Sequence, residues 1–176
     1  MTGNHGETIF PVAVIVLSDR AHSGERHDAC IPVVRDAILG RPLAIDVETI
    51  LPDDPARLQA ALIELCDGPT RLVLTSGGTG LGERDRTPQA TAAVIDYEVP
   101  GLAEAMRAAS VRQHTRAAML SRAIAGVRNR SLIVNLPGSP KGVRETLDAI
   151  VDQLPHGLAL LAGIATDHHP AGIHEG

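Results

Sequence analysis

The chain has 176 residues, with 16 Lys and Arg against 21 Asp and Glu, so its formal net charge is −5. That length fits one domain with a sizeable hydrophobic core. A mildly acidic chain lacks the positive charge expected of a general nucleic-acid-binding protein. Aromatic residues make up 1% of the chain, Phe10 and Tyr97 with no Trp, whereas single-strand binding proteins stack bases on aromatic side chains. The composition therefore argues against nucleic acid as a partner.

The two cysteines, Cys30 and Cys66, are too few for a disulfide framework and lack the CxxC spacing of zinc sites. Cys66 continues a helical apolar pattern, which predicts a small buried residue. The first ten residues lack the basic and apolar regions of a signal peptide. No apolar run approaches the roughly 20 residues that span a bilayer. We therefore expect a soluble cytoplasmic protein without a membrane partner.

Strand-like and helix-like segments alternate along the chain. Residues 12–17 form a continuous apolar run rich in β-branched residues, typical of a strand buried on both faces of a parallel sheet. Further strands are expected at 43–50, 71–75, 120–127 and 132–135. Helices are expected at 31–39, from Pro55, from Thr87, at 101–111, and from Ser139 to an interruption at Pro155. This alternation predicts an α/β fold of three α/β/α layers with a mostly parallel central sheet.

Ligands of such sheets bind beyond the carboxyl ends of the strands, so four loops become candidates. They are residues 18–20, 52–54, 75–80 and 136–141. The third loop holds Gly77, Gly78 and Gly80 around Thr79; glycines let backbone N–H groups approach a phosphate or a flat ring, and the threonine adds a hydroxyl donor. A tight turn alone is expected to need one glycine, so three favour contact with a ligand. The spacing matches neither GxGxxG nor a Walker A loop.

Two carboxylates lie beside helix starts without an obvious structural task. Asp54 and Thr87 each directly precede a proline, as helix N-caps do. Asp53 and Asp85 are then left over, and paired carboxylates suit Mg²⁺, which binds hard oxygen ligands together with substrate phosphates. Solvated loop carboxylates remain the alternative.

The last of the four loops ends at a helix start. Ser139 there fits both an ordinary N-cap and an anion-binding helix start to which Lys141 adds positive charge. The two interpretations are compatible, so both stay open.

Three segments of the chain resemble the molybdopterin-binding MogA/MoaB family. LTSGGTGLGERDRTPQAT resembles the TGGTG…RD.TP.AT signature, NLPGSPKGV the N.PG.P motif, and SDRAHSGERHDACIP the SDR…SG…D pattern. PGLAEAMR and LSRAIAGVR fit the blocks between them. The resemblance spans residues 11–163 and implies one molybdopterin-binding domain there, after an N-terminal extension at 1–10. Residues 164–176, with His168, His169 and His174, are expected to be a mobile solvated tail rather than a metal site.

The resemblance implies a molybdopterin adenylyltransferase, which transfers AMP from ATP to molybdopterin with Mg²⁺ and releases pyrophosphate. The two functional aspartates of the family fall on Asp53 and Asp85, which are thereby implied to be catalytic and to hold the metal. The implied nucleotide-binding residues are Ser18, Asp19, Gly77, Gly78, Thr79 and Gly80. The implied pterin-binding residues are Ser121, Pro137, Gly138, Ser139, Pro140 and Lys141.

The chain departs from the family pattern at two positions, and other functions remain as alternatives. Cys30 stands where many relatives have a small residue, and Ser139 stands where Asn or Gln is common. The family implies a homotrimer, or a hexamer in some members, and contact with a molybdenum-insertion protein. A pterin-binding or scaffold protein without turnover is the main alternative, and the presence of both Asp53 and Asp85 argues against it. Molybdate insertion would require additional domains, and a CinA-type domain fits the sequence blocks less well.

Overall fold

The computed structural model describes residues 8–164, which build a six-stranded sheet in the order β2-β1-β3-β6-β5-β4. The strands are β1 (Phe10–Leu17), β2 (Leu43–Leu51), β3 (Leu72–Ser76), β4 (Tyr97–Glu98), β5 (Ala125–Arg128) and β6 (Ser131–Leu136). The neighbours β2, β1, β3 and β6 are parallel, whereas β5 runs antiparallel to both β6 and β4. The expected mostly parallel sheet is confirmed.

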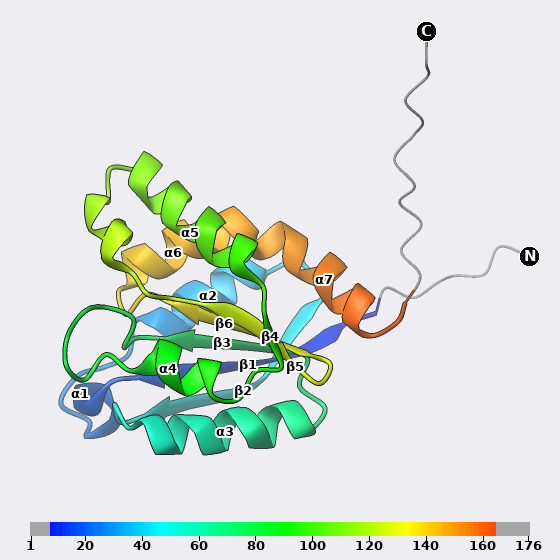
Figure 1. Cartoon of the computed structure of the whole chain (residues 1–176), viewed down its shortest axis with the longest axis horizontal. Helices are drawn as coiled ribbons and strands as arrows, with labels where there is room; N and C mark the ends of the chain where they lie inside the picture. The colour runs from blue at the N-terminus through cyan, green and yellow to red at the C-terminus, as the bar shows by residue number, and fades with distance from the viewer. Residues whose placement is uncertain (1–7, 165–176) are drawn as a thin grey trace, which may run out of the picture.

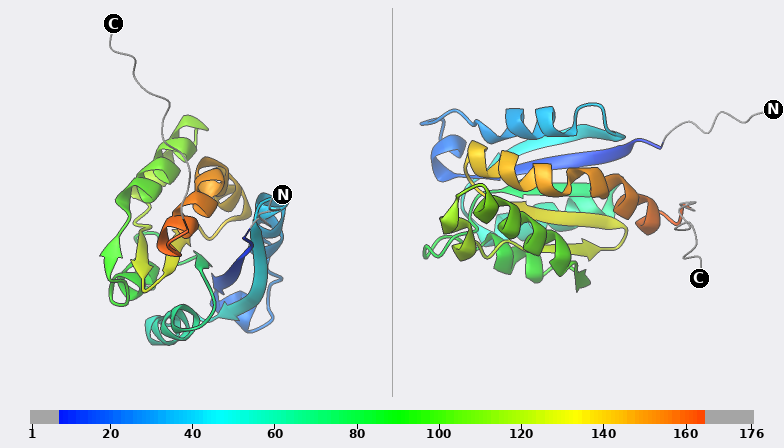
Figure 2. Two further views of the ribbon diagram at one scale, coloured as in Figure 1. Left: turned by 90° about the vertical axis from the view of Figure 1, so that its right-hand side faces the viewer. Right: turned by 90° about the horizontal axis from the view of Figure 1, so that it is seen from above.

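Helices cover both faces of this sheet (Figures 1 and 2). One face carries α2 (Cys30–Ile38), α5 (Pro100–Arg112), α6 (Pro140–Ile150) and α7 (Leu154–Leu161). The other face carries α3 (Pro55–Asp67) and α4 (Thr87–Ala92). The short α1 (Asp19–His22) directly follows β1, and two 3-10 turns complete the set, η1 (Arg116–Leu120) and η2 (Val151–Gln153). The expected three-layer α/β/α architecture is therefore confirmed.

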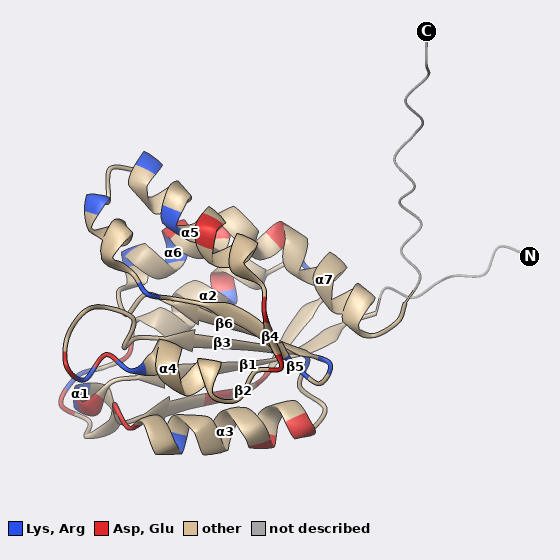
Figure 3. Ribbon diagram, in the orientation of Figure 1, with Lys and Arg blue, Asp and Glu red and all other residues tan. Residues whose placement is uncertain are grey.

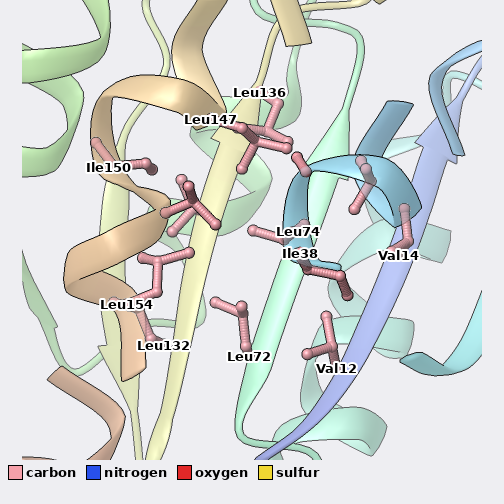
Figure 4. Packing of buried hydrophobic residues seen from close by; sticks show 14 of the residues in the cluster. Val12, Val14, Ile38, Leu72, Leu74, Leu132, Leu136, Leu147, Ile150 and Leu154 are labelled. Carbon is pink, nitrogen blue, oxygen red and sulfur yellow. The ribbon is translucent and has the colours of Figure 1, made fainter. Parts of the chain in front are cut away.

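The core is divided in two by the sheet, because successive side chains of a strand point to opposite faces. Val12 and Val14 of β1 pack with α2, α6 and α7, while Ala13 and Ile15 pack with α3 and α4. Figure 4 shows the first cluster, in which Leu72, Leu74, Leu132 and Leu136 meet Ile38, Leu147, Ile150 and Leu154. Cys66 is buried in the second cluster, as its helical pattern predicts. No helix within residues 8–164 is long and apolar enough to cross a membrane.

Two helix boundaries confirm the local signals in the sequence. Asp54 is the N-cap of α3, and its carboxylate accepts hydrogen bonds from the N–H groups of Ala56 and Arg57 at 2.9 and 3.2 Å. The last long helix is interrupted: α6 ends at Ile150 and α7 begins at Leu154, just before Pro155. Proline has no N–H to donate to the preceding turn, which explains a new helix start at that point.

Other local predictions were wrong. Arg86, not Thr87, occupies the N-cap position of α4, and it makes no side-chain cap hydrogen bond. The strand expected at 120–127 begins only at Ala125, because residues 116–120 form the 3-10 turn η1. The short elements α1 and β4 were not predicted; they have four and two residues, too few to show a periodicity. The C-terminal histidines and the tail beyond residue 164 lie outside the described residues.

Candidate functional site

The four candidate loops meet at one edge of the sheet, where β1, β2, β3 and β6 end (Figure 1). The loops after β1 and β2 are joined reciprocally: the N–H of Asp19 donates to Oδ2 of Asp53 at 3.3 Å, and the N–H of Asp53 donates to Oδ1 of Asp19 at 3.0 Å. The loops after β3 and β6 are joined by the Ser76 hydroxyl, which donates to the Pro137 carbonyl at 2.8 Å. These hydrogen bonds join the four loops in two pairs.

Two glycines of the loop after β3 are required by the local backbone conformation and packing. Gly77 and Gly78 have φ angles of 111° and 63°, a region that side chains disfavour. A Cβ at Gly77 would lie 2.4 Å from the carbonyl oxygen of Leu17, and one at Gly78 would lie 2.4 Å from Oγ1 of Thr87. The expectation that the turn itself needs only one glycine was wrong, because packing already requires two.

The Asp85 carboxylate lies against the same loop. Its Oδ2 accepts a hydrogen bond from the N–H of Gly82 at 2.8 Å. A Cβ would lie 2.9 Å from that oxygen at Gly80 and 2.7 Å from it at Gly82. Both glycines therefore make room for the Asp85 carboxylate.

Arg122 fixes the position of this loop from outside it. Its Nε donates to the Gly80 carbonyl at 2.7 Å, its Nη2 donates to the Asp85 carbonyl, and its backbone N–H donates to the Thr79 carbonyl at 2.9 Å. One residue from the segment before β5 thus holds two carbonyls of the glycine loop and that of Asp85.

Asp53 belongs to a separate charged cluster at the same edge. Arg84 forms an ion pair with Asp19, with Nη1 and Oδ2 2.6 Å apart, and its Nη2 lies 3.5 Å from the Asp53 carbonyl oxygen. Figure 3 shows acidic and basic residues side by side on α1 and the loops around it. An ion pair therefore joins Arg84 to Asp19, and hydrogen bonds involving backbone groups join both residues to Asp53.

The residues that could hold a divalent cation here are few. Within residues 8–164 no three His, Cys, Asp or Glu side chains form a group able to hold a metal. Asp53 and Asp85 are half-buried, and each accepts its one hydrogen bond through Oδ2, which leaves Oδ1 available. Mg²⁺ commonly takes one or two carboxylates and completes its shell with substrate phosphates and water. Each carboxylate alone therefore offers a hard oxygen of the kind that Mg²⁺ takes together with substrate phosphates.

A cavity of about 230 Å³ lies between α5, η1 and the start of α6. From the residues implied by the family resemblance it collects Thr79 and Gly80 of the nucleotide group together with Ser121, Pro137 and Ser139 of the pterin group. The side chains that line the rest of the wall are of two kinds: apolar ones, from Ala103, Met106, Ala117, Ala118, Leu120 and Ala123, and polar ones, from Arg107, Ser110, Thr115, Asn135, Glu145 and Thr146. A flat apolar ring with a polar end would suit this wall.

Other residues of the pterin group lie apart from this cavity. Gly138 and Pro140 line a second cavity of about 130 Å³ with Ser18 and Cys30. Lys141 is 76% exposed, and its Nζ lies 3.6 Å from Oε1 of Glu145. The residues of the pterin group from Pro137 to Lys141 are contiguous in the sequence motif, but in the structure they do not all line the same cavity.

Ser139 acts as the N-cap of α6, as one of its two interpretations predicts. Its Oγ accepts a hydrogen bond from the N–H of Gly142 at 3.1 Å. The same residue lines the 230 Å³ cavity, so the helix start also faces the space where a ligand would bind.

The structure adds three residues to those identified from the sequence: Arg84, Arg122 and Glu145. Arg84 precedes Asp85 and Arg122 follows Ser121, so both adjoin motif residues and could have been considered. Glu145 lines the 230 Å³ cavity and is 4% exposed. Nothing in its local sequence distinguishes it from a solvated helix residue.

Comparisons with known proteins agree with the fold and with the motifs. A family described as "Probable molybdopterin binding domain" matches residues 13–156. The chain is 41% identical to a molybdopterin adenylyltransferase of Escherichia coli K12, over 80% of this chain and 73% of that protein. It is 39% identical to a molybdopterin adenylyltransferase of Helicobacter pylori J99, over 86% of this chain and 88% of that protein.

A solved structure extends the similarity to three dimensions. The molybdopterin biosynthesis enzyme MoaB of Thermus thermophilus superposes with a TM-score of 0.83 at 46% identity. The match covers 88% of this chain and 98% of that one. The similarity therefore extends over most of the described fold.

Proposed function

The chain belongs to the family of probable molybdopterin binding domains, and from that membership we propose that it is a molybdopterin adenylyltransferase of molybdenum cofactor biosynthesis. Relatives that carry this name match most of the chain at 39–41% identity. The reaction would be the transfer of AMP from ATP to molybdopterin.

The chemistry needs no nucleophile from the protein. An oxygen of the terminal phosphate of molybdopterin forms a bond to the α-phosphorus of ATP, the bond from that phosphorus to the bridging oxygen of the β-phosphate breaks, and pyrophosphate leaves. In such transfers the protein contributes in-line positioning and neutralises the charge on the phosphate oxygens. Bound Mg²⁺ would supply part of that neutralisation.

The family resemblance implies the following roles for the residues. Asp53 and Asp85 would hold Mg²⁺ through their available oxygens. The glycine loop from Gly77 to Gly80, with Ser18 and Asp19, would bind the nucleotide. Ser121 and the helix start at 137–141 would bind the pterin and its phosphate, because a helix N-terminus favours an anion.

One observation supports this proposal above the others: the 230 Å³ cavity joins the two halves of the implied site. Thr79 and Gly80 from the nucleotide loop line it together with Ser121, Pro137 and Ser139 from the pterin group. A transfer between two substrates requires that their reacting ends meet, and a cavity lined by residues of both groups would allow this.

The direct test is adenylyl transfer in vitro, with purified protein, freshly prepared molybdopterin, ATP and Mg²⁺, and with adenylyl-molybdopterin and pyrophosphate quantified. Asp53→Asn and Asp85→Asn should each lower turnover by on the order of 100-fold while pterin binding survives. Asp54→Asn is the matched control: it removes the same charge next to Asp53, and Asn caps a helix as well as Asp does.

Two results would count against the proposal. Full activity of both aspartate variants would refute the metal-binding role. Tight binding of molybdopterin without any product in the parent protein would move the chain to the class of binding or scaffold proteins.

The assembly implied by the family resemblance is a separate proposal. We expect a homotrimer that contacts a molybdenum-insertion protein. Size-exclusion chromatography with light scattering would measure the assembly, and a monomer at micromolar concentration would contradict it.

A further inference from the structure

Glu145 is a buried carboxylate that the fold itself leaves half-satisfied. It lies in the second turn of α6 and is 4% exposed. Its Oε1 accepts a hydrogen bond from the Thr115 hydroxyl at 3.0 Å and lies 3.6 Å from Nζ of Lys141. Its Oε2 is buried and has no hydrogen-bond partner in the described part of the chain.

An unpartnered buried acceptor is costly, and a charged one more so, which is why such groups are rare in folded proteins. No donor among residues 8–164 makes a hydrogen bond to Oε2. Arg107, a lining residue that carries donors, uses Nη1 on the carbonyl of Ala123 at 2.9 Å. Glu145 lines the cavity, and its unpartnered Oε2 is the acceptor that a ligand bound there would satisfy.

Two lining residues on α6 and its N-cap give the cavity different preferences. One is Ser139 at the start of the helix, where N–H groups and the helix dipole favour an anion. The other is Glu145, which follows six residues later, about 9 Å along the axis at 1.5 Å per residue. Apolar residues of α5 and η1 line the same cavity. A ligand with a phosphate at one end and a flat ring bearing N–H donors at the other would fit both preferences.

We propose that Glu145 determines specificity for the pterin ring, its carboxylate accepting the adjacent N3–H and 2-amino N–H donors of the 2-amino-4-oxopyrimidine edge. The inference rests on the proposed function for the identity of the substrate. A carboxylate only accepts hydrogen bonds and offers about four lone-pair positions, so two neighbouring N–H donors match it. Adenine presents one amino group flanked by ring nitrogens that accept, and those acceptors would face a carboxylate oxygen unfavourably.

Glu145→Gln tests this with little change of shape. The Gln side chain keeps an acceptor for Thr115 but presents an NH₂ group where a second acceptor stood. The KM for molybdopterin should rise by about 10- to 100-fold, the range expected for a lost hydrogen bond to a charged group, while the KM for ATP stays unchanged. Asp148→Asn, on an exposed position of the same helix, is the control for the loss of charge and should leave both KM values unchanged.

A binding experiment without ATP separates this inference from the proposed function. Pterin and lumazine, which carries a 2-carbonyl in place of the 2-amino group, are fluorescent ring probes. The parent protein should prefer pterin, and Glu145→Gln should shift the ratio of the two affinities toward lumazine by tenfold or more, because the Gln NH₂ can donate to the carbonyl. Thr115→Val, which removes the hydroxyl that orients Oε1, should shift the ratio in the same direction by less.

The outcomes are distinct. An unchanged ratio in Glu145→Gln, with thermal unfolding showing an intact fold, would overturn the inference, and so would a rise in the KM for ATP alone. A purely structural role would weaken both probes equally and leave the ratio where it was. If the parent protein transfers no AMP but shows the predicted ratio and its shift, the proposed function fails while the role of Glu145 stands.

Discussion

Gly77→Ala should destabilise the protein through the backbone of the candidate site. Gly77 has φ 111° and directly follows β3. A Cβ there would lie 2.4 Å from the carbonyl oxygen of Leu17, at the end of the neighbouring strand β1. That oxygen belongs to the backbone of a central strand, so no rotation of a side chain can relieve the clash.

The magnitude has two parts. A side chain in a left-handed backbone conformation costs roughly 1–2 kcal/mol, and inserting an atom into a packed site costs about 1–3 kcal/mol. Together they lower the free energy of unfolding by about 2–5 kcal/mol, a large share of the 5–15 kcal/mol typical of a domain. For a chain of this length we expect Tm to fall by roughly 4–20 °C.

The assay is urea unfolding of Gly77→Ala followed by circular dichroism, with Gly101→Ala as the matched control. Gly101 lies in the first turn of α5, where an added methyl group would meet open space. The control should unfold as the parent does or gain up to about 1 kcal/mol, since Ala favours helix more than Gly. If Gly77→Ala had the urea midpoint of the parent, the packing explanation for this glycine would be refuted.

Two further predictions concern the loop carboxylate and the thiols. Gly80→Ala should lower the free energy of unfolding by less than about 1 kcal/mol, because a Cβ there would meet only the movable end of the Asp85 side chain, at 2.9 Å. The kcat/KM for AMP transfer should nevertheless fall by on the order of tenfold or more, because the added methyl group displaces that carboxylate. An unchanged kcat/KM would contradict this. Burial raises the pKa of the Cys30 and Cys66 thiols, and the thiolate is the form that reacts with iodoacetamide. At about pH 8, iodoacetamide should therefore label both cysteines more slowly in the folded protein than in urea, as measured by mass spectrometry. The folded state holds these thiol protons more tightly than the unfolded state does. Their contribution to the free energy of unfolding should therefore be fully present below the ordinary thiol pKa of 9.0 and lost as the pH rises through the raised pKa values. Equal labelling rates in the two states, or urea midpoints that do not fall above pH 9.0, would contradict the effect of burial.

Local chemistry made part of the fold predictable from the sequence. The Asp54-Pro55 pair indicated the start of α3, and a carboxylate in that position caps a helix whatever surrounds it. The apolar run at 12–17 indicated a strand buried on both faces, and it lies next to the middle of the sheet. Parallel strands in turn predicted that four loops would share one edge. These inferences needed only backbone geometry and periodicity, which act over a few residues.

The same kind of reasoning failed where tertiary packing determines the outcome. Thr87 looked like a cap because a proline follows it, but the chain places it inside α4, with its hydroxyl where a Cβ of Gly78 would lie. The ion pair between Arg84 and Asp19 joins residues 65 positions apart, and the link from Asp19 to Asp53 spans 34. No local pattern contains such partners.

Glu145 shows most clearly the difference between what the sequence determines and what the tertiary structure decides. At about 100° per residue, it lies on the side of α6 opposite the stripe of Val143, Leu147 and Ile150. The sequence by itself therefore determines that this helix buries its apolar stripe on the sheet and places Glu145 on the opposite side. Only the tertiary structure brings Thr115, at the turn between α5 and η1, onto the far side of the helix and encloses the carboxylate. The physical reason is that periodicity specifies the face of a helix that meets the sheet, whereas burial of the opposite face depends on which distant element packs over it.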